Sequence, residues 1–379
     1  MSARTKLGVP RGVPRVLAGF GLMSAAGLAD AAYDLNLPRG VTPISREVFD
    51  LHMLVLWVCV AIGIVVFSAM FYSIIRHRKS KGAVAAKFHE STVVEVLWTI
   101  VPFLILIGMA IPATKTLIAM EDTRNADVSI KVTGYQWKWR YDYLDDGVGF
   151  FSTLSTPKDE IFNRAEKNPH YLLEVDHPMV VPVNKKVRLL ITANDVIHSW
   201  WVPVFGMKKD AIPGFVNEMW INVDTPGTYR GQCAELCGKD HGFMPIVVVA
   251  KEQADYDQWL ADQQQASAAA AADSDREFSK DELMARGEKV FTANCAACHQ
   301  ANGEGVPGAF PALKGGVIAT GPVPGHLDIV LHGKNGTAMA AFGSQLNDAD
   351  LAAVITYERN AWGNDTGDVV QPADVKAAR

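Results

Sequence analysis

Two cysteines, a histidine and a methionine lie close together in the middle part of the sequence. Cys233 and Cys237 are four residues apart, and His241 and Met244 follow within the next seven residues. His198 comes directly after a predicted strand and could supply a second imidazole. Thiolates, imidazoles and a thioether are soft ligands, and in combination they favour copper. We therefore predict a copper site at which side chains from one loop and one strand converge.

Two other interpretations of this stretch remain open at the level of sequence. Structural zinc sites usually place their cysteines closer together, in C-x2-C pairs, and rarely use a thioether. A disulfide between Cys233 and Cys237 is the purely structural alternative. Two thiolates also carry enough charge to bridge two copper ions, whereas a mononuclear blue copper site needs only one.

A second group of ligands lies near the end of the sequence. Cys295-Ala296-Ala297-Cys298-His299 has the C-x2-C-H pattern of covalent haem attachment, in which the histidine binds the iron. Met339 lies downstream and could bind the other face of the iron, which would raise the haem potential. His326 and His332 are alternative distal ligands. A thioredoxin-like redox pair is the rival interpretation of the two cysteines, but the βαβ context that it requires is absent.

The N-terminus has the features of an export signal. Basic residues precede an apolar stretch from Val16 to Ala29, which is too short for a helix that spans a bilayer. Ala29-Asp30-Ala31 offers a small-x-small cleavage site. We predict a signal peptide over residues 1–31, with a permanent anchor as the alternative.

A transmembrane hairpin is predicted over residues 45–118. Its spans are expected at about 53–75, where there is no charged residue, and at about 93–117. The loop between them carries five basic residues, which places it in the cytoplasm and everything after residue 118 on the periplasmic side. Glu95 lies near the start of the second span. It is either a boundary residue that reaches the interface or a proton-path group that faces a partner subunit.

The composition favours a short membrane-spanning section attached to larger soluble domains. Hydrophobic residues make up 49% of the 379 residues and charged residues 20%, and two or three domains are the expectation for this length. The net charge of −5 argues against a nucleic-acid partner. Five cysteines are too few for a disulfide scaffold, and Cys59, alone in an apolar run, is expected to be a buried structural thiol.

The exported part is expected to contain two different domains. Residues 119–252 have short β-branched runs separated by turn residues, which is typical of an all-β Greek-key sandwich or barrel. Residues 253–279 are rich in alanine and glutamine and are predicted to form a linker, helical at most at its start. Residues 280–363 have helical patterns that flank a loop-rich middle, and residues 364–379 are predicted to form a flexible tail.

The chain from the hairpin through Val249 resembles subunit II of haem–copper cytochrome c oxidases. Besides the cysteine loop, three segments carry the resemblance: Glu95-Val96-Leu97-Trp98-Thr99, Gly134-Tyr135-Gln136-Trp137-Lys138-Trp139 and Asp210-Ala211-Ile212-Pro213-Gly214. The resemblance implies a cupredoxin fold and a dinuclear copper centre, CuA. The implied ligands are Cys233 and Cys237 as bridges, His198 and His241 on one copper each, Met244 and the backbone carbonyl of Glu235.

The same resemblance implies further functional residues. The Glu235 carboxylate would reach a magnesium ion at the boundary with subunit I. Trp137 matches the aromatic residue through which electrons enter from a docked cytochrome c, whereas Trp139 is expected to pack within a strand. Glu95 would lie at the entrance of a proton path in subunit I.

Residues from about Lys280 to Gly363 resemble a class I cytochrome c domain. Within them, Gly308-Ala309-Phe310-Pro311-Ala312-Leu313 resembles the segment whose proline backs the haem histidine. The whole chain is therefore similar to subunit II of a caa3-type oxidase in a bacterial inner membrane. It would pass electrons from cytochrome c through haem c and CuA to the haem of subunit I, where oxygen is reduced and protons are pumped.

Three other functions share parts of this pattern. A copper-delivery protein would need incomplete, exchangeable ligation, and a quinol oxidase subunit would lack the copper ligands. A CuA-dependent nitric oxide reductase subunit is the nearest competitor because its electron relay would be similar. Glu95 with its neighbours and Glu235 favour the oxidase.

Overall fold

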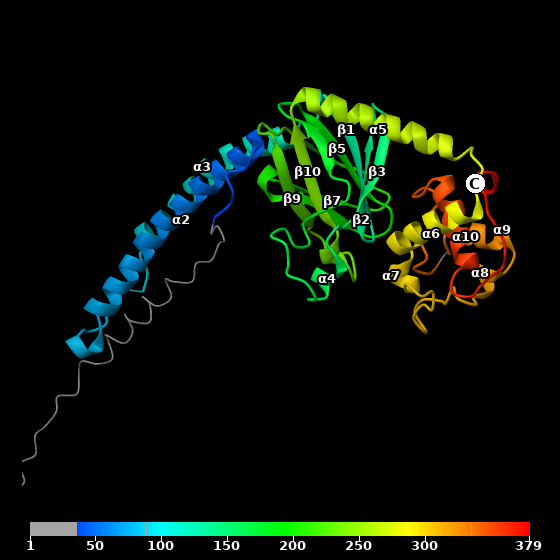
Figure 1. Cartoon of the computed structure of the whole chain (residues 1–379). Coiled ribbons are helices and arrows are strands. Elements are labelled where there is room, and N and C mark those ends of the chain that lie inside the picture. The colour runs from blue at the N-terminus through cyan, green and yellow to red at the C-terminus, as the bar shows by residue number, and fades with distance from the viewer. Residues whose placement is uncertain (1–35, 88, 335) are drawn as a thin grey trace, which may run out of the picture. The chain divides into compact units, whose positions relative to one another are not determined.

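The computed structural model describes residues 36–87, 89–334 and 336–379 (Figure 1). The predicted signal peptide, residues 1–31, lies outside the described residues.

Two long helices, α2 (Pro43–Arg76) and α3 (Thr92–Glu121), form the predicted hairpin, with a short 3-10 helix, η2 (Lys79–Lys81), between them. The start of α2 is fixed by a capping box, in which Thr42 Oγ1 accepts from the Ser45 amide and Ser45 Oγ accepts from the Thr42 amide, both at 3.0 Å. Pro43 occupies the first helical position, where its missing N–H costs nothing.

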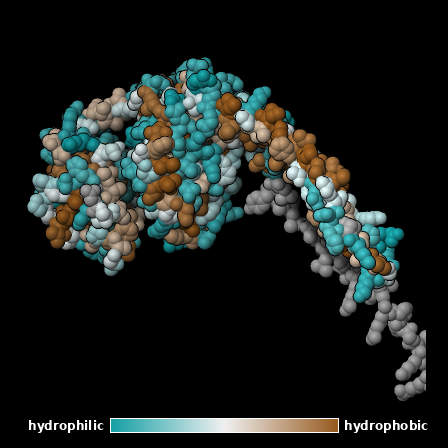
Figure 2. Space-filling view, turned by 180° about the vertical axis from the view of Figure 1, so that it is seen from behind, coloured by the Kyte–Doolittle hydropathy of each residue, from teal (hydrophilic) through white to brown (hydrophobic). Residues whose placement is uncertain are grey.

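Both helices are long and apolar enough to cross a membrane, which confirms the two predicted spans. Their apolar side chains point outwards rather than into a protein core, and Figure 2 shows them along the surface of the helix pair. Such a surface is stable only in contact with lipid or with other apolar helices. Cys59 lies on this surface and is exposed, so the expectation of a buried structural thiol was wrong.

A sandwich of two five-stranded sheets follows, as expected for a cupredoxin-like domain. One sheet has the strand order β3-β2-β1-β5-β8 and the other β4-β10-β9-β6-β7. The strands are β1 (Val128–Tyr135), β2 (Lys138–Tyr143), β3 (Val148–Ser152), β4 (Met179–Pro182), β5 (Val187–Ala193), β6 (His198–Val202), β7 (Met207–Ala211), β8 (Asn217–Ile221), β9 (Gly227–Cys233) and β10 (Pro245–Lys251). Short helices lie in three connections: α4 (Lys158–Ile161), η3 (Pro203–Phe205) and η4 (His241–Phe243).

The sandwich core follows from the two-residue period of its strands. In β5, Val187, Leu189 and Ile191 are buried, and the residues between them are only partly buried. These side chains meet the buried faces of the other sheet, which include Trp200 and Ile246. The two sheets therefore form a rigid frame for the loops at their ends.

The segment predicted as a linker is largely helical. Helix α5 (Gln253–Asp273) covers most of residues 253–279. Tyr256, Trp259 and Leu260 on its first turns pack against the sandwich core, and the Trp259 ring lies 5.2 Å from that of Tyr143. The prediction of a helix only at the start of this segment is corrected, because alanine and glutamine favour a helix and its aromatic residues gain a packing partner.

The last domain is all-α. It consists of α6 (Lys280–Asn294), α7 (Ala296–His299), α8 (Val317–Thr320), α9 (Val323–His332), α10 (Asp348–Asn360) and α11 (Pro372–Ala378). Helices α6 and α10 cross closely, since a Cβ on Gly287 would lie only 2.1 Å from the carbonyl oxygen of Ala353. The core between them contains Leu283, Phe291 and Ile355.

The prediction of a flexible tail over residues 364–379 is also corrected. Helix α11 lies within this segment, and Val370 and Val375 are buried in the core of the all-α domain. Gln371 both donates to and accepts from the backbone of Phe278, at 2.9 and 3.0 Å. Val370 and Val375 are isolated apolar residues without helical periodicity, so the sequence pattern did not predict a helix here. Their burial nevertheless holds the segment against the domain.

Candidate metal centres

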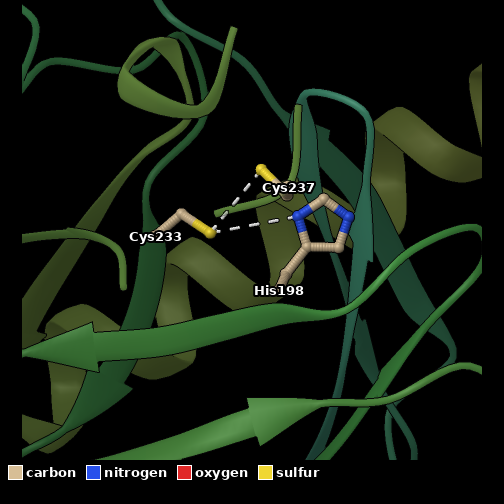
Figure 3. Close-up of side chains that lie close together, drawn as sticks. All are labelled: His198, Cys233 and Cys237. Atoms are coloured by element: carbon tan, nitrogen blue, oxygen red, sulfur yellow. Dashed lines mark hydrogen bonds between the residues drawn. The ribbon is translucent and has the colours of Figure 1, made fainter. Parts of the chain in front are cut away.

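Strand pairing brings His198 to the cysteine loop. In the antiparallel pair of β6 and β9, Trp200 faces Cys233, so His198, at the start of β6, lies beside the end of β9. The Ala234 amide extends this contact by donating to the Ser199 carbonyl at 3.0 Å. His198, Cys233 and Cys237 are buried, and their donor atoms all lie within 4.8 Å of one another (Figure 3).

The loop between β9 and β10 supplies the other donor atoms. Cys237 Sγ lies 3.9 Å from Cys233 Sγ, 3.5 Å from His241 Nδ1 and 3.5 Å from Met244 Sδ. Cys233 Sγ lies 3.9 Å from His198 Nδ1 and 3.3 Å from the Glu235 carbonyl oxygen. Both cysteines are free thiols, so the disulfide alternative does not describe this structure.

The electrostatic environment of the two thiols favours a bound cation. Burial opposes ionisation of Cys233, but its contacts with His198 and nearby backbone groups lower the pKa of this thiol to about 7. Burial and the adjacent Cys233 sulfur raise the pKa of Cys237 to about 12. Two thiolates this close repel each other, and metal ions between them would remove that repulsion. The soft donor set and its geometry therefore fit a copper centre.

The His198 ring is held in one orientation by its surroundings. Its Nε2 lies 2.9 Å from Asp195 Oδ1, which leaves Nδ1 on the side of Cys233, where its lone pair would bind a metal ion. The Trp139 ring packs edge-on against the imidazole at 5.9 Å between centroids. Gly134 on β1 leaves room for this ring, since a Cβ there would lie 2.8 Å from the imidazole Cδ2.

The all-α domain presents the second ligand group. Cys295 follows α6, and α7 contains Cys298 and ends at His299. His299 is buried, and its Nδ1 lies 2.9 Å from the Pro311 carbonyl oxygen, the contact expected of that proline segment. With Nδ1 engaged, Nε2 is the ring nitrogen left for a metal.

Met339 lies in the loop between α9 and α10 and is half-buried. His326 is in a different situation, because its Nε2 lies 2.8 Å from Glu358 Oε2 and both side chains are buried. His332 is exposed and pairs with Asp328 at 3.0 Å. His326 Nδ1 is buried without a hydrogen-bond partner among the described residues, and Met339 stays the predicted distal haem ligand.

Comparison with known proteins gives the same three-part organisation. The family model described as cytochrome c oxidase subunit II, transmembrane domain, matches residues 30–116, and that of the periplasmic domain matches residues 128–251. The model described as cytochrome c oxidase, cbb3-type, subunit III, matches residues 282–357. A protein of Rickettsia conorii, named probable cytochrome c oxidase subunit 2, is 39% identical over 257 residues, which are 64% of this chain and 80% of the relative. The chain belongs to the cytochrome c oxidase subunit II family.

A further relative agrees with this subunit II assignment, and a solved structure of a periplasmic domain is similar in sequence. Cytochrome c oxidase subunit 2 of Cereibacter sphaeroides is 35% identical over 232 residues, 58% of this chain and 77% of the relative. The crystal structure of the periplasmic domain of subunit II from Bradyrhizobium japonicum is 44% identical, with 38% of this chain and 97% of that chain covered and a TM-score of 0.34. The chain is thus a subunit of a haem–copper oxidoreductase with a cytochrome c domain fused at its C-terminal side.

The aromatic segment of this subunit II contacts the cysteine loop. Trp137 is half-buried, and its indole Nε1 donates to the Cys237 carbonyl at 3.3 Å. Gln136 Nε2 donates to the same oxygen at 2.8 Å. Trp139 is fully buried in β2, as expected for a residue that packs within a strand.

The two predicted carboxylates lie on exposed surfaces. Glu95 is in the first turn of α3, and its carbonyl accepts from Thr99 Oγ1 at 2.9 Å. The Glu235 side chain is exposed, although its carbonyl faces Cys233. Their roles toward subunit I and magnesium stay predictions.

Sequence reasoning missed the residues that support these centres. Asp195 precedes His198 by three residues, a spacing that could have signalled a carboxylate behind an imidazole. Glu358 gave no such signal, because its contact with His326 joins residues 32 positions apart.

Proposed function

We propose that this subunit II relays electrons from cytochrome c through its own haem c and a dinuclear CuA centre to the haem of subunit I, for oxygen reduction coupled to proton pumping. The observation that carries this proposal is the convergence of six donor groups at one end of the sandwich: His198, Cys233, the Glu235 carbonyl, Cys237, His241 and Met244.

Each donor has a defined part in the proposed copper site. Cys233 and Cys237 would bridge two ions, His198 and His241 would each hold one, and Met244 and the Glu235 carbonyl would be weak ligands. A mixed-valence copper pair, when bound, accepts and releases one electron with the charge shared by both ions. The surrounding residues keep the ligand positions fixed, because β6 and β9 are paired and the thiols are buried. Fixed ligands limit the rearrangement that each electron transfer requires.

The fused domain would hold haem c. Cys295 and Cys298 would form thioethers with the porphyrin, and His299 and Met339 would bind the iron from opposite faces. The Pro311 carbonyl supports this role, since it orients the His299 ring.

Trp137 is proposed as the residue through which electrons reach the copper site. Its hydrogen bond to the Cys237 carbonyl gives a short bonded connection between the half-buried indole and a copper ligand.

The remaining assignments concern partners and location. Glu95 is proposed to line the entrance of a proton path in subunit I, and the Glu235 carboxylate to reach magnesium at the subunit boundary. Both domains after the hairpin are proposed to lie on the periplasmic side of a bacterial inner membrane, because the basic loop around Lys79 and Lys81 would stay in the cytoplasm.

An electron paramagnetic resonance experiment tests the copper proposal. The purified, copper-loaded full chain should give a mixed-valence signal with coupling to two copper nuclei. Cys233→Ser and Cys237→Ser should each abolish that signal while haem c stays attached, because a dinuclear site needs both thiolates. Cys59→Ser is the matched control, since this thiol lies on α2 and should leave the spectrum unchanged. An unaltered two-copper signal in either loop variant would reject the assignment.

A further inference from the structure

The loop that carries Met339 is joined to the rest of the domain at its second half, where Phe342 and Leu346 pack against the core. It runs from Gly333 to Asn347, between α9 and α10. Near its start, the Lys334 amide donates to the Met339 carbonyl at 3.0 Å, and this bond closes only a local turn. Beyond Met339, the Phe342 and Gly343 amides donate to carbonyls at the end of α9, at 2.9 and 3.0 Å. In this second half the Phe342 carbonyl accepts from the Gln345 and Leu346 amides, whereas the Gly343 and Leu346 carbonyls accept from donors outside the loop.

Arg379 supplies those donors. Its Nη1 donates to the Gly343 carbonyl, and its Nη2 donates to the Leu346 carbonyl at 2.9 Å. Its Nε donates to Asp348 Oδ1 at 2.6 Å, at the first residue of α10. The guanidinium thus joins two loop carbonyls to a carboxylate whose side chain is only 13% exposed. Three directed bonds from one rigid, permanently charged group are a geometry that arginine provides and lysine cannot.

The backbone that carries Arg379 is itself anchored. Helix α11 is fixed by Val375, which is fully buried, and by the paired hydrogen bonds between Gln371 and Phe278. The Arg379 amide donates to the Val375 carbonyl at 3.2 Å. The guanidinium is therefore attached to the core of the domain, and its contacts limit the movement of the loop.

We propose that Arg379 is a positioning residue that holds the Met339 loop so that the thioether stays on the haem iron. The inference rests on the proposed function, in which Met339 is the distal ligand. Between Met339 and α10, the guanidinium is the charged group that binds the backbone of the loop at Gly343 and Leu346. Without it, two carbonyls lose a charged donor, and the loop opens more often. Each opening exposes the iron to any competing ligand in solution.

Competition by imidazole measures this opening directly. The test uses the purified full chain with haem attached and copper omitted, so that only the haem absorbs in the far red. Ferric haem bonded to a methionine sulfur has a weak far-red charge-transfer band, which disappears when imidazole replaces the sulfur. We expect Arg379→Ala to lower the imidazole concentration that removes half of this band by about tenfold or more, as the loss of hydrogen bonds from a charged donor predicts. Arg379→Lys should fall close to Arg379→Ala, because lysine cannot bridge the two carbonyls and Asp348 together.

The control is Lys376→Ala in the same helix, where the exposed ammonium pairs with Asp275 at 2.8 Å. It should match the wild type. A wild-type chain without the far-red band would reject Met339 as the ligand, and the inference with it. A wild-type band together with an unchanged imidazole midpoint in both Arg379 variants would reject the role of Arg379 alone. Equal shifts in the Lys376 and Arg379 variants would also reject it, because α11 would then act only through general stability.

Discussion

The Asp195 carboxylate accepts from three groups at the copper site of this subunit II. Oδ1 lies 2.9 Å from His198 Nε2 and 2.7 Å from the Val196 amide, and Oδ2 accepts from the Gln136 amide at 2.8 Å. One carboxylate thus orients a proposed copper ligand and also fixes the turn next to Trp137. The sequence resemblance assigns copper binding at His198 and electron entry at Trp137 to separate motifs. Asp195, which belongs to neither motif, connects them in space.

Asp195→Ala should weaken copper binding by about 10–100-fold, the usual cost of losing the partner of a metal-binding histidine. The reason is that the His198 ring would no longer be held with Nδ1 toward Cys233. Competition with a copper chelator measures the affinity. Asp195→Asn should have a smaller effect, because the amide oxygen still accepts from Nε2. Asp176→Ala is the control, since Asp176 accepts from Thr153 in a different part of the domain. Equal affinities for the alanine variant and the wild type would contradict the positioning role.

Trp137→Phe should slow electron transfer to the copper site several-fold and leave the copper spectrum intact. Phenylalanine keeps the aromatic ring but removes the hydrogen bond to the Cys237 carbonyl. Stopped-flow reduction by a soluble donor gives the rate. Trp220→Phe is a matched control, because Trp220 is also half-buried and donates its indole N–H to a backbone carbonyl, that of Ala119, at 3.1 Å. If both variants slow the reaction equally, Trp137 has no special part in it.

The copper ligands could be predicted from sequence because residue type alone carries the information. Four of them lie within twelve positions, and so dense a set of soft donors is typical of a site for a soft metal ion. His198 could be added because a predicted strand ends near it. The spacing of Asp195 and His198 could have signalled their contact, but the second contact of Asp195 could not be predicted, since it depends on how the turn before β6 folds back on Gln136.

The predictions for residues 253–279 and 364–379 were wrong for other physical reasons. Residues 253–279 have a polar, repetitive composition, yet Tyr256, Trp259 and Leu260 follow the i, i+3, i+4 spacing of a helix face. That spacing alone could have predicted a helix that packs against the sandwich. Val370 and Val375 have no such spacing, so the order of the segment after residue 363 depends on tertiary contacts that the local sequence does not encode.

His326→Leu should destabilise the fused domain by about 3–5 kcal/mol, because it leaves the Glu358 carboxylate buried without its partner. Chemical denaturation of the full chain, followed through the haem absorption, reports on this domain. The double variant His326→Leu, Glu358→Leu should recover part of the loss, since it removes the unpaired charge together with its partner. His332→Leu is the control, because His332 pairs with Asp328 on the surface. A double variant as unstable as the sum of its single variants would show that the two side chains do not interact.

The last prediction concerns Glu95, which lies in the first turn of α3 with its side chain exposed. If Glu95 lines a proton path in subunit I, its carboxylate must exchange protons during turnover, and Glu95→Ala should slow oxygen reduction by the assembled oxidase several-fold. The copper and haem c spectra should not change, because α3 contributes none of the proposed ligands. Glu95→Asp should retain most of the activity, since it keeps a carboxyl group on the same turn. Glu90→Ala is the matched control, because Glu90 is also exposed but precedes the helix. Unchanged oxygen uptake in Glu95→Ala would make Glu95 a boundary residue, whose carboxylate lies at the membrane interface without moving protons.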